Sequence, residues 1–177
     1  MAESRYNYCQ TNARIDNRKG SSRNTDMKTK WSKLNHLQLG KYSEYLVIME
    51  FTKHSFDVYS SEVDDKGIDF IVRKNENEYF DIQVKSINKG KYVYMPKRTF
   101  EPRKNLFLAL VIYGSDENEP TLLLIPSMDW KDKKHKFLVE RNYEDRQSEP
   151  EWGISITKSN IQEIKAEYLF NVKIVEL

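Results

Sequence analysis

The segment from residue 67 to residue 86, GIDFIVRKNENEYFDIQVKS, constrains the fold more than any other part of the chain. Two runs of alternating apolar residues flank a polar stretch at residues 74–78, which is the pattern of a β-hairpin. A turn centred on Glu76 places Asp69 directly opposite Gln83, because each lies seven positions from the turn. Alternate side chains of a strand share a face, so Lys85 lies on the face of Gln83.

The other face of this predicted hairpin is apolar throughout. It carries the side chains of Ile68, Phe70, Val72, Phe80, Ile82 and Val84. A hairpin needs such a dry face to pack against a core. It does not need an acid, an amide and a lysine on the opposite face, and these three residues are therefore candidates for function.

The rest of the chain reads as an α/β protein. An amphipathic helix is expected from about Lys33 to Lys53 and a strand over residues 56–60. Residues 107–113 and 121–125 are almost continuously apolar, as in strands covered on both faces. Residues 92–95 could continue the second hairpin strand, residues 126–130 begin a short helix, and residues 131–150 look loop-like. A helix from Thr157 or Ser159 to about Ala166 and a final strand over residues 171–175 complete the expectation.

The order of these motifs resembles the PD-(D/E)XK nuclease superfamily, which has the restriction-endonuclease-like fold. Its signature is an aspartate, a strand turn and then Glu/Gln-x-Lys, matched here by Asp69 and by residues 83–85, QVK. Upstream, residues 40–44, GKYSE, match the Gly-x-x-x-Glu helix motif of its resolvase-like branches. The match extends over roughly residues 33–130 and is similar to small bacterial members and archaeal Holliday junction resolvases. It implies a mixed central sheet flanked by helices.

The resemblance also implies a metal-dependent nuclease acting on DNA in repair, recombination or defence. Glu44, Asp69, Gln83 and Lys85 would be the catalytic residues. Mg²⁺ or Mn²⁺ would be held by Asp69, Gln83, the backbone carbonyl of Val84 and Glu44, because Mg²⁺ prefers hard oxygen ligands. Lys85 would orient or polarise the attacking water and stabilise developing negative charge. Junction-cutting relatives act as dimers, so a homodimer is one option.

Two positions depart from the family pattern. Ile68 replaces the proline that often precedes the aspartate, and Gln83 replaces the second acid. The neutral amide removes one negative charge, so weaker metal binding and slow turnover are expected. The alternative is a catalytically inactive restriction-like domain that binds nucleic acid or a protein partner.

The candidate residues also have structural interpretations. Asp69 could stabilise a turn, Glu44 could be a solvated helix charge, and Gln83 and Lys85 could form a polar strand face. Asp81, on the face of Gln83, could be a further ligand or an ion-pair partner of Lys85. Residues 64 and 65 are acids in the preceding loop, and the second of them is a fallback ligand if the register differs.

Positive charge is clustered although the net charge is only +2. Residues 1–41 hold nine Lys/Arg and three Asp/Glu, and residues 85–104 hold seven Lys/Arg and one acid. Basic clusters on an otherwise acidic chain indicate contact with a phosphate backbone. Tyr92, Tyr94 and Phe100 lie within the second cluster and could stack bases or pack a strand edge. The predicted nucleic-acid-binding residues are Lys89, Lys91, Lys97, Arg98, Arg103 and Lys104.

Residues 1–26 are polar, basic and without periodicity, and they are expected to be a disordered tail preceding a single domain over residues 27–177. The longest apolar run, residues 106–113, is far too short to span a bilayer. The single cysteine, Cys9, can form no internal disulfide, which fits a reducing cytosol. A cytoplasmic protein without membrane contact is therefore expected.

Overall fold

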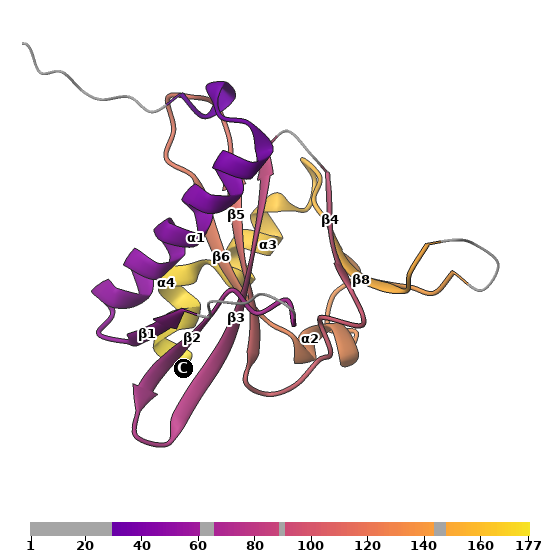
Figure 1. The fold of residues 1–177 in the computed structure, drawn as a ribbon. Helices are drawn as coiled ribbons and strands as arrows, with labels where there is room; N and C mark the ends of the chain where they lie inside the picture. Colours follow the sequence, from indigo (N-terminus) through magenta and orange to yellow (C-terminus); the bar gives the residue numbers. More distant parts are fainter. Residues whose placement is uncertain (1–29, 61–65, 89–90, 144–147) are drawn as a thin grey trace, which may run out of the picture.

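The computed structural model describes residues 30–60, 66–88, 91–143 and 148–177 (Figure 1). The predicted tail, the acids at positions 64 and 65, and Lys89 lie outside these residues. Within them, no helix is long and apolar enough to cross a membrane.

Among the described residues, eight strands form two sheets, and four α-helices lie around them. The central sheet has the order β1-β2-β3-β5-β6, and the smaller sheet has the order β4-β8-β7. Only β3 and β5 are parallel neighbours. The predicted fold class, a mixed central sheet flanked by helices, is therefore confirmed. The strands are β1 (Asp57–Ser60), β2 (Phe70–Asn75), β3 (Glu78–Asn88), β4 (Tyr92–Pro96), β5 (Leu106–Tyr113), β6 (Thr121–Pro126), β7 (Leu138–Arg141) and β8 (Glu151–Ser155). The α-helices are α1 (His36–Lys53), α2 (Met128–Lys131), α3 (Ile161–Tyr168) and α4 (Phe170–Lys173), and 3₁₀ turns cover Trp31–Lys33 and Ile174–Glu176.

The hairpin forms in the predicted register. Phe70 pairs with Ile82 and Val72 with Phe80, so the turn falls next to Glu76. The ladder nevertheless ends at Phe70, and Asp69 lies just before it. The Asp69 amide donates to the carbonyl of Ile82 (N···O 3.0 Å). The backbone hydrogen bond of Asp69 is therefore shifted by one residue, to Ile82, and Asp69 is not paired directly with Gln83.

Helix α1 begins with a capping box. The Asn35 side chain accepts from the Gln38 amide, and the Gln38 side chain accepts from the Asn35 amide, so two otherwise unpaired amides are satisfied. The buried residues of α1 follow at four-residue intervals, which puts them on one face. They are Leu39, Ser43, Val47 and Phe51.

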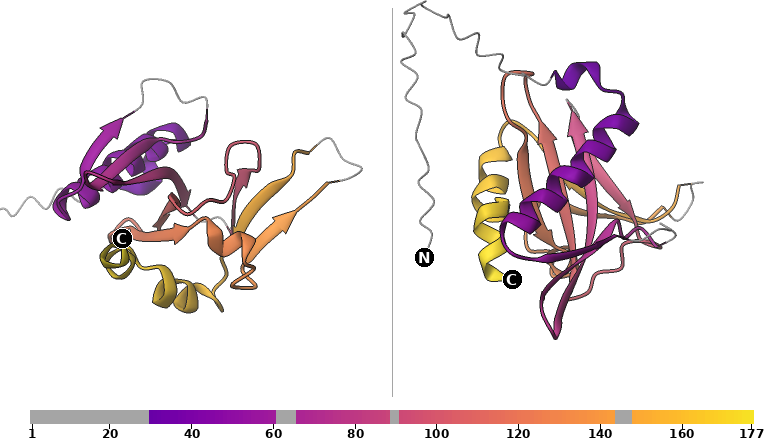
Figure 2. Two further views of the ribbon diagram at one scale, coloured as in Figure 1. Left: turned by 90° about the horizontal axis from the view of Figure 1, so that it is seen from below. Right: turned by 60° about the vertical axis from the view of Figure 1, so that its left-hand side comes forward.

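Helix α1 packs on one face of the central sheet and the second sheet packs on the other. In the right-hand view of Figure 2, α1 crosses the front of the central sheet and the yellow C-terminal helices run along its edge. A hydrophobic core lies on each face of the central sheet, and strand β5 contributes to both because its side chains point alternately to the two faces. Phe107 and Ala109 pack with α1, whereas Leu108 and Leu110 pack with the second sheet.

Three predictions about the second half of the chain are wrong. Residues 92–95 do not continue the hairpin strand but form β4, which pairs with β8. Residues 131–150 include β7, an edge strand whose only fully buried side chain is Leu138. Residues 171–175 are helical, because Phe170 and Ile174 lie one helical turn apart and are both buried.

The predicted helix near residue 160 is present with shifted ends. Thr157 accepts the Asn160 amide through its hydroxyl, and α3 begins at the next residue, Ile161. It ends at Tyr168, two residues later than expected.

Candidate active site

Asp69 is hydrogen-bonded to the two residues that flank Gln83. Its amide donates to the Ile82 carbonyl, and its carboxylate accepts the Val84 amide (Oδ2···N 2.6 Å). The carboxylate thus replaces a backbone acceptor at the position where the β2–β3 ladder stops. The predicted neighbourhood of Asp69 and Gln83 is therefore present, although it is made by these two bonds and not by direct strand pairing.

Gln83 is buried and its carbonyl oxygen is unsatisfied. The side chain is 4% exposed, and Oε1 has no hydrogen-bond partner among the residues described. A buried acceptor without a partner costs about 1–3 kcal/mol. Such an atom calls for an explanation, and a bound ligand is one.

Gly67 leaves the space that the Gln83 side chain occupies, because glycine has no Cβ. Its φ is +70°, and a Cβ at this position would lie 2.8 Å from Gln83 Nε2 and 2.8 Å from Thr99 Cβ. Only glycine combines this backbone conformation with such close neighbours. Gly67 therefore lies against one side of the amide, where a larger residue would collide with it.

Lys85 follows Gln83 by two positions on β3 and lies on the same face of the strand. It is partly buried, and no hydrogen bond or ion pair engages its ammonium group within the described part of the chain. The predicted alternative, an ion pair with Asp81, is wrong. Asp81 is bound instead by the Arg103 guanidinium (Nη2···Oδ2 2.7 Å).

Helix α1 brings Glu44 to the same region. Glu44 accepts a hydrogen bond from Lys41 (Nζ···Oε2 2.6 Å), and this bond is the main reason that the pKa of Lys41 is raised. The negative charge of Asp69 makes a smaller contribution to raising the pKa of Lys41. The Glu44 carboxylate thus already has a cationic partner in Lys41.

The oxygen atoms of this site suit a hard divalent cation. In the described ranges, no group of three His, Cys, Asp or Glu side chains could hold a metal alone. Mg²⁺ does not require such a group, because it usually keeps several waters and binds one or two carboxylates. The Asp69 carboxylate and the unsatisfied Gln83 oxygen fit this kind of sparse site, with the Val84 carbonyl as a further oxygen.

Several residues of the predicted nucleic-acid-binding set are already paired with acids. Lys97 binds Glu140 (2.6 Å) and Arg98 binds Glu149 (2.8 Å). Arg103 is held by Asp81, as described above. Within the predicted set, the exposed cations that have no side-chain partner among the described residues are Lys91 and Lys104.

The aromatic residues of the basic segment differ in their surroundings. Phe100 is fully buried against Trp130 (ring centroids 5.5 Å apart), so it belongs to the core and cannot stack on a base. The Tyr92 hydroxyl donates to Glu151 (2.8 Å), and burial followed by this bond raises the Tyr92 pKa far above its ordinary value. Tyr94 is 55% exposed.

The sequence did not single out Gly67, Thr99 and Lys41 as parts of this site. Lys41 and Glu44 have the three-residue spacing that lets side chains meet on a helix, which was a readable signal. Thr99 carries no local signal, because its approach to Gly67 joins two distant parts of the chain.

No protein-family model matches this sequence, and no curated protein matches it. Solved structures that resemble the fold include the following two. One is Hjc, a Holliday junction resolvase from the archaeal hyperthermophile Archaeoglobus fulgidus, with 14% identity, a TM-score of 0.44, and coverage of 74% of this chain and 98% of that chain. The other is a bacterial homing endonuclease, with 21% identity, a TM-score of 0.38, and coverage of 65% of this chain and 83% of that chain. Both of these proteins are nucleases.

Proposed function

We propose that this chain is a metal-dependent phosphodiesterase that cleaves DNA, with its site at Asp69, Gln83 and Lys85. The observation that carries the proposal is the buried, unsatisfied oxygen of Gln83 next to Asp69, whose amide and carboxylate are hydrogen-bonded to the two residues that flank Gln83. Mg²⁺ or Mn²⁺ would satisfy this oxygen. Asp69, Gln83 and the Val84 carbonyl would hold the ion, with Glu44 joining directly or through water.

Each residue has a separate role in this proposal. Asp69 supplies the negative charge, and its bond to the Val84 amide fixes the direction of the carboxylate. A bound divalent ion supplies charge neutralisation on the phosphate and a more acidic water. Lys85, without a competing carboxylate among the described residues, directs its ammonium group at the attacking water and the phosphate oxygens. The water oxygen would bond to phosphorus and release a proton to solvent, the bridging P–O bond would break, and the leaving oxygen would take up a proton from solvent.

The charge distribution suggests how DNA would be held. Lys91 and Lys104, which have no side-chain partner among the described residues, would contact phosphates directly. Lys97 and Arg98 would first have to exchange their carboxylate partners for phosphates. Arg103 is best regarded as structural, because it neutralises the partly buried Asp81.

The test is cleavage of a labelled panel containing duplex, single strand, flap, four-way junction and RNA, with Mg²⁺ or Mn²⁺. Asp69→Asn and Lys85→Met are the variants, and Asp57→Asn and Lys131→Met are matched controls on exposed surface. We expect metal-dependent DNA cleavage in the wild type and controls, and its loss in both site variants. Cleavage by a well-folded Asp69→Asn protein would refute the assignment.

A catalytically silent binding domain is the second candidate. It is favoured by the neutral Gln83 and by the engagement of Glu44 with Lys41. Gln83→Glu separates the two proposals, because an added carboxylate next to Asp69 should tighten Mn²⁺ binding in calorimetry and speed cleavage if the site binds metal. No Mn²⁺ binding by either protein, with DNA binding intact, would indicate the silent domain.

A further inference from the structure

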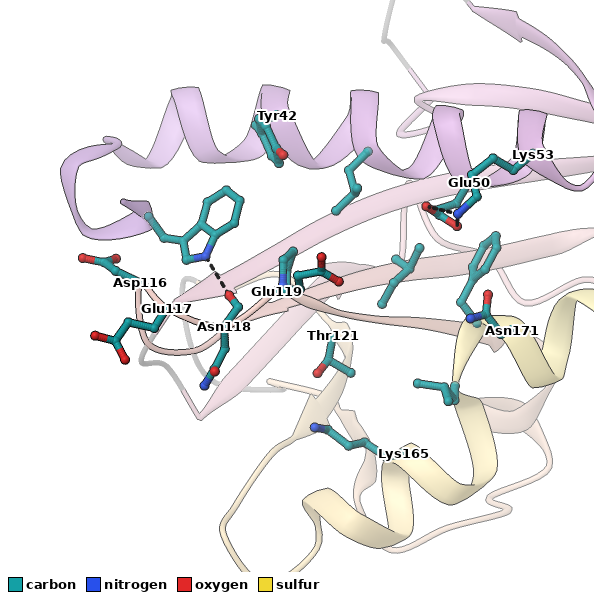
Figure 3. A pocket seen from close by; sticks show the side chains of 16 residues that line it. Tyr42, Glu50, Lys53, Asp116, Glu117, Asn118, Glu119, Thr121, Lys165 and Asn171 are labelled. Carbon is teal, nitrogen blue, oxygen red and sulfur yellow. Dashed lines mark hydrogen bonds and ion pairs between the residues drawn. The ribbon is translucent and has the colours of Figure 1, made fainter. Parts of the chain in front are cut away.

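A groove lies away from the proposed catalytic residues, between α1, the turn that joins β5 to β6, and the C-terminal helices (Figure 3). Its volume is about 790 Å³, and none of Glu44, Asp69, Gln83 and Lys85 lines it. Apolar side chains that line it include Trp31, Tyr42, Leu46, Leu122, Leu169 and Phe170. Polar side chains, among them Thr121, Lys165 and Asn171, line it as well, so the groove offers a mixed surface to a segment that can lie along it.

Acidic side chains are concentrated at one end of this groove, which we call the acidic groove. Asp116, Glu117 and Glu119 belong to the single β5–β6 turn. Glu117 and Glu119 are exposed and have no cationic partner among the residues described. Elsewhere in the groove, Glu50 is neutralised by Lys53 (3.0 Å). This end repels phosphate and attracts a basic partner.

The chain enters the described structure at this same end. Trp31 donates from its indole nitrogen to the carbonyl of Asn118 (3.1 Å), and Ser32 donates from its amide (2.8 Å) and hydroxyl (2.6 Å) to Asp116. These bonds fix the start of the described chain against the acidic turn. The preceding 29 residues are thus tethered beside the groove, and they contain six Lys/Arg and three Asp/Glu.

We propose that the basic N-terminal segment of this chain, residues 18–29, occupies the acidic groove, with Arg23 and Lys28 meeting Glu117 and Glu119. The three observations that carry it are the groove with its mixed polar and apolar lining, the acids without a cationic partner at its end and the basic segment attached there. Tethering raises the local concentration of the segment to about the millimolar range, so individually weak contacts suffice. The inference does not depend on the proposed nuclease activity.

The test uses the full chain and its single cysteine. Cys9→Ser combined with Ser22→Cys moves the only thiol into the proposed segment, where it accepts a nitroxide spin label. Paramagnetic broadening of backbone amide signals is then measured by NMR. We expect the Leu122 and Asn171 signals of the groove to lose intensity several-fold, and the signal of Gly153 in the second sheet to be unchanged.

A charge-reversed pair tests the electrostatic part. Glu117→Lys with Glu119→Lys should restore the groove signals, as should high salt, which screens exposed charges. The matched control is Glu76→Lys with Glu163→Lys, two exposed acids away from the groove, which should leave the broadening intact.

Three outcomes would overturn the proposal. The first is equal broadening at the groove and at Gly153, and the second is groove broadening that survives the Glu117/Glu119 reversal. The third is broadening that appears only when the spin label and the isotope label are on different molecules, which would indicate that a second copy fills the groove.

Discussion

Gly67→Ala should damage both the fold and the proposed site. At φ +70° a residue with a Cβ costs about 1–2 kcal/mol. The new methyl group would also lie 2.8 Å from Thr99 Cβ and 2.8 Å from Gln83 Nε2, and overpacking of this kind costs about 1–3 kcal/mol. Alanine also lowers the conformational entropy of the unfolded chain, which stabilises the folded state by about 0.4–1 kcal/mol. The free energy of unfolding should therefore fall by about 1–4.5 kcal/mol.

Urea denaturation measures this change, and Gly40→Ala is the matched control. Gly40 lies inside α1, and an added methyl group there would meet nothing within 4 Å apart from its own helix, so alanine should stabilise by about 0.5–1 kcal/mol. The two substitutions add the same methyl group and should have opposite signs. If Gly67→Ala shifted the free energy of unfolding by less than about 0.5 kcal/mol, the confinement of Gln83 by Gly67 would be refuted.

Three further predictions concern packing and pH. Phe51→Ala should lower the free energy of unfolding by about 3–5 kcal/mol in urea denaturation, because this fully buried ring packs edge-on against other phenylalanines. The Lys134 hydrogen bond lowers the pKa of Glu167, so the carboxylate stabilises the fold above its ordinary value of 4.5, and that stability is lost as the pH falls through the lowered pKa. Lys134→Met should reduce this acid-dependent loss in a pH series of thermal melts. Gly153→Ala should lower the free energy of unfolding by about 1–3 kcal/mol in urea, because its Cβ would overlap the Tyr92 hydroxyl oxygen.

Each of these has a control and a contradicting result. Tyr45→Ala, on the exposed side of α1, should change stability far less than Phe51→Ala, and equal losses would contradict the assigned core. Lys136→Met, on nearby exposed surface, should leave the acid-dependent loss unchanged. Gly114→Ala has open space around it, so an equal cost at Gly114 and Gly153 would contradict the assigned clash.

The sequence determined the parts of this protein that depend on local pattern. Alternating apolar residues fixed the hairpin register, because a one-residue slip would expose Phe70 and Ile82. The capping box at Asn35 and the four-residue spacing of buried residues defined α1. Gln83 and Lys85 fall on one strand face for the same reason of alternation.

Tertiary structure decided everything that depends on distant partners. A strand as short as β7 has no recognisable pattern of its own and exists because β8 pairs with it. Arg103 binds Asp81 and not a phosphate because the chain returns beside β3 at β5. The burial of Gln83 and the unsatisfied state of its Oε1 likewise depend on the packing of distant parts of the chain. Backbone geometry and the alternation of side chains act over a few residues, so they can be recognised in the sequence. Burial and charge pairing depend on which surfaces meet after folding, so they cannot.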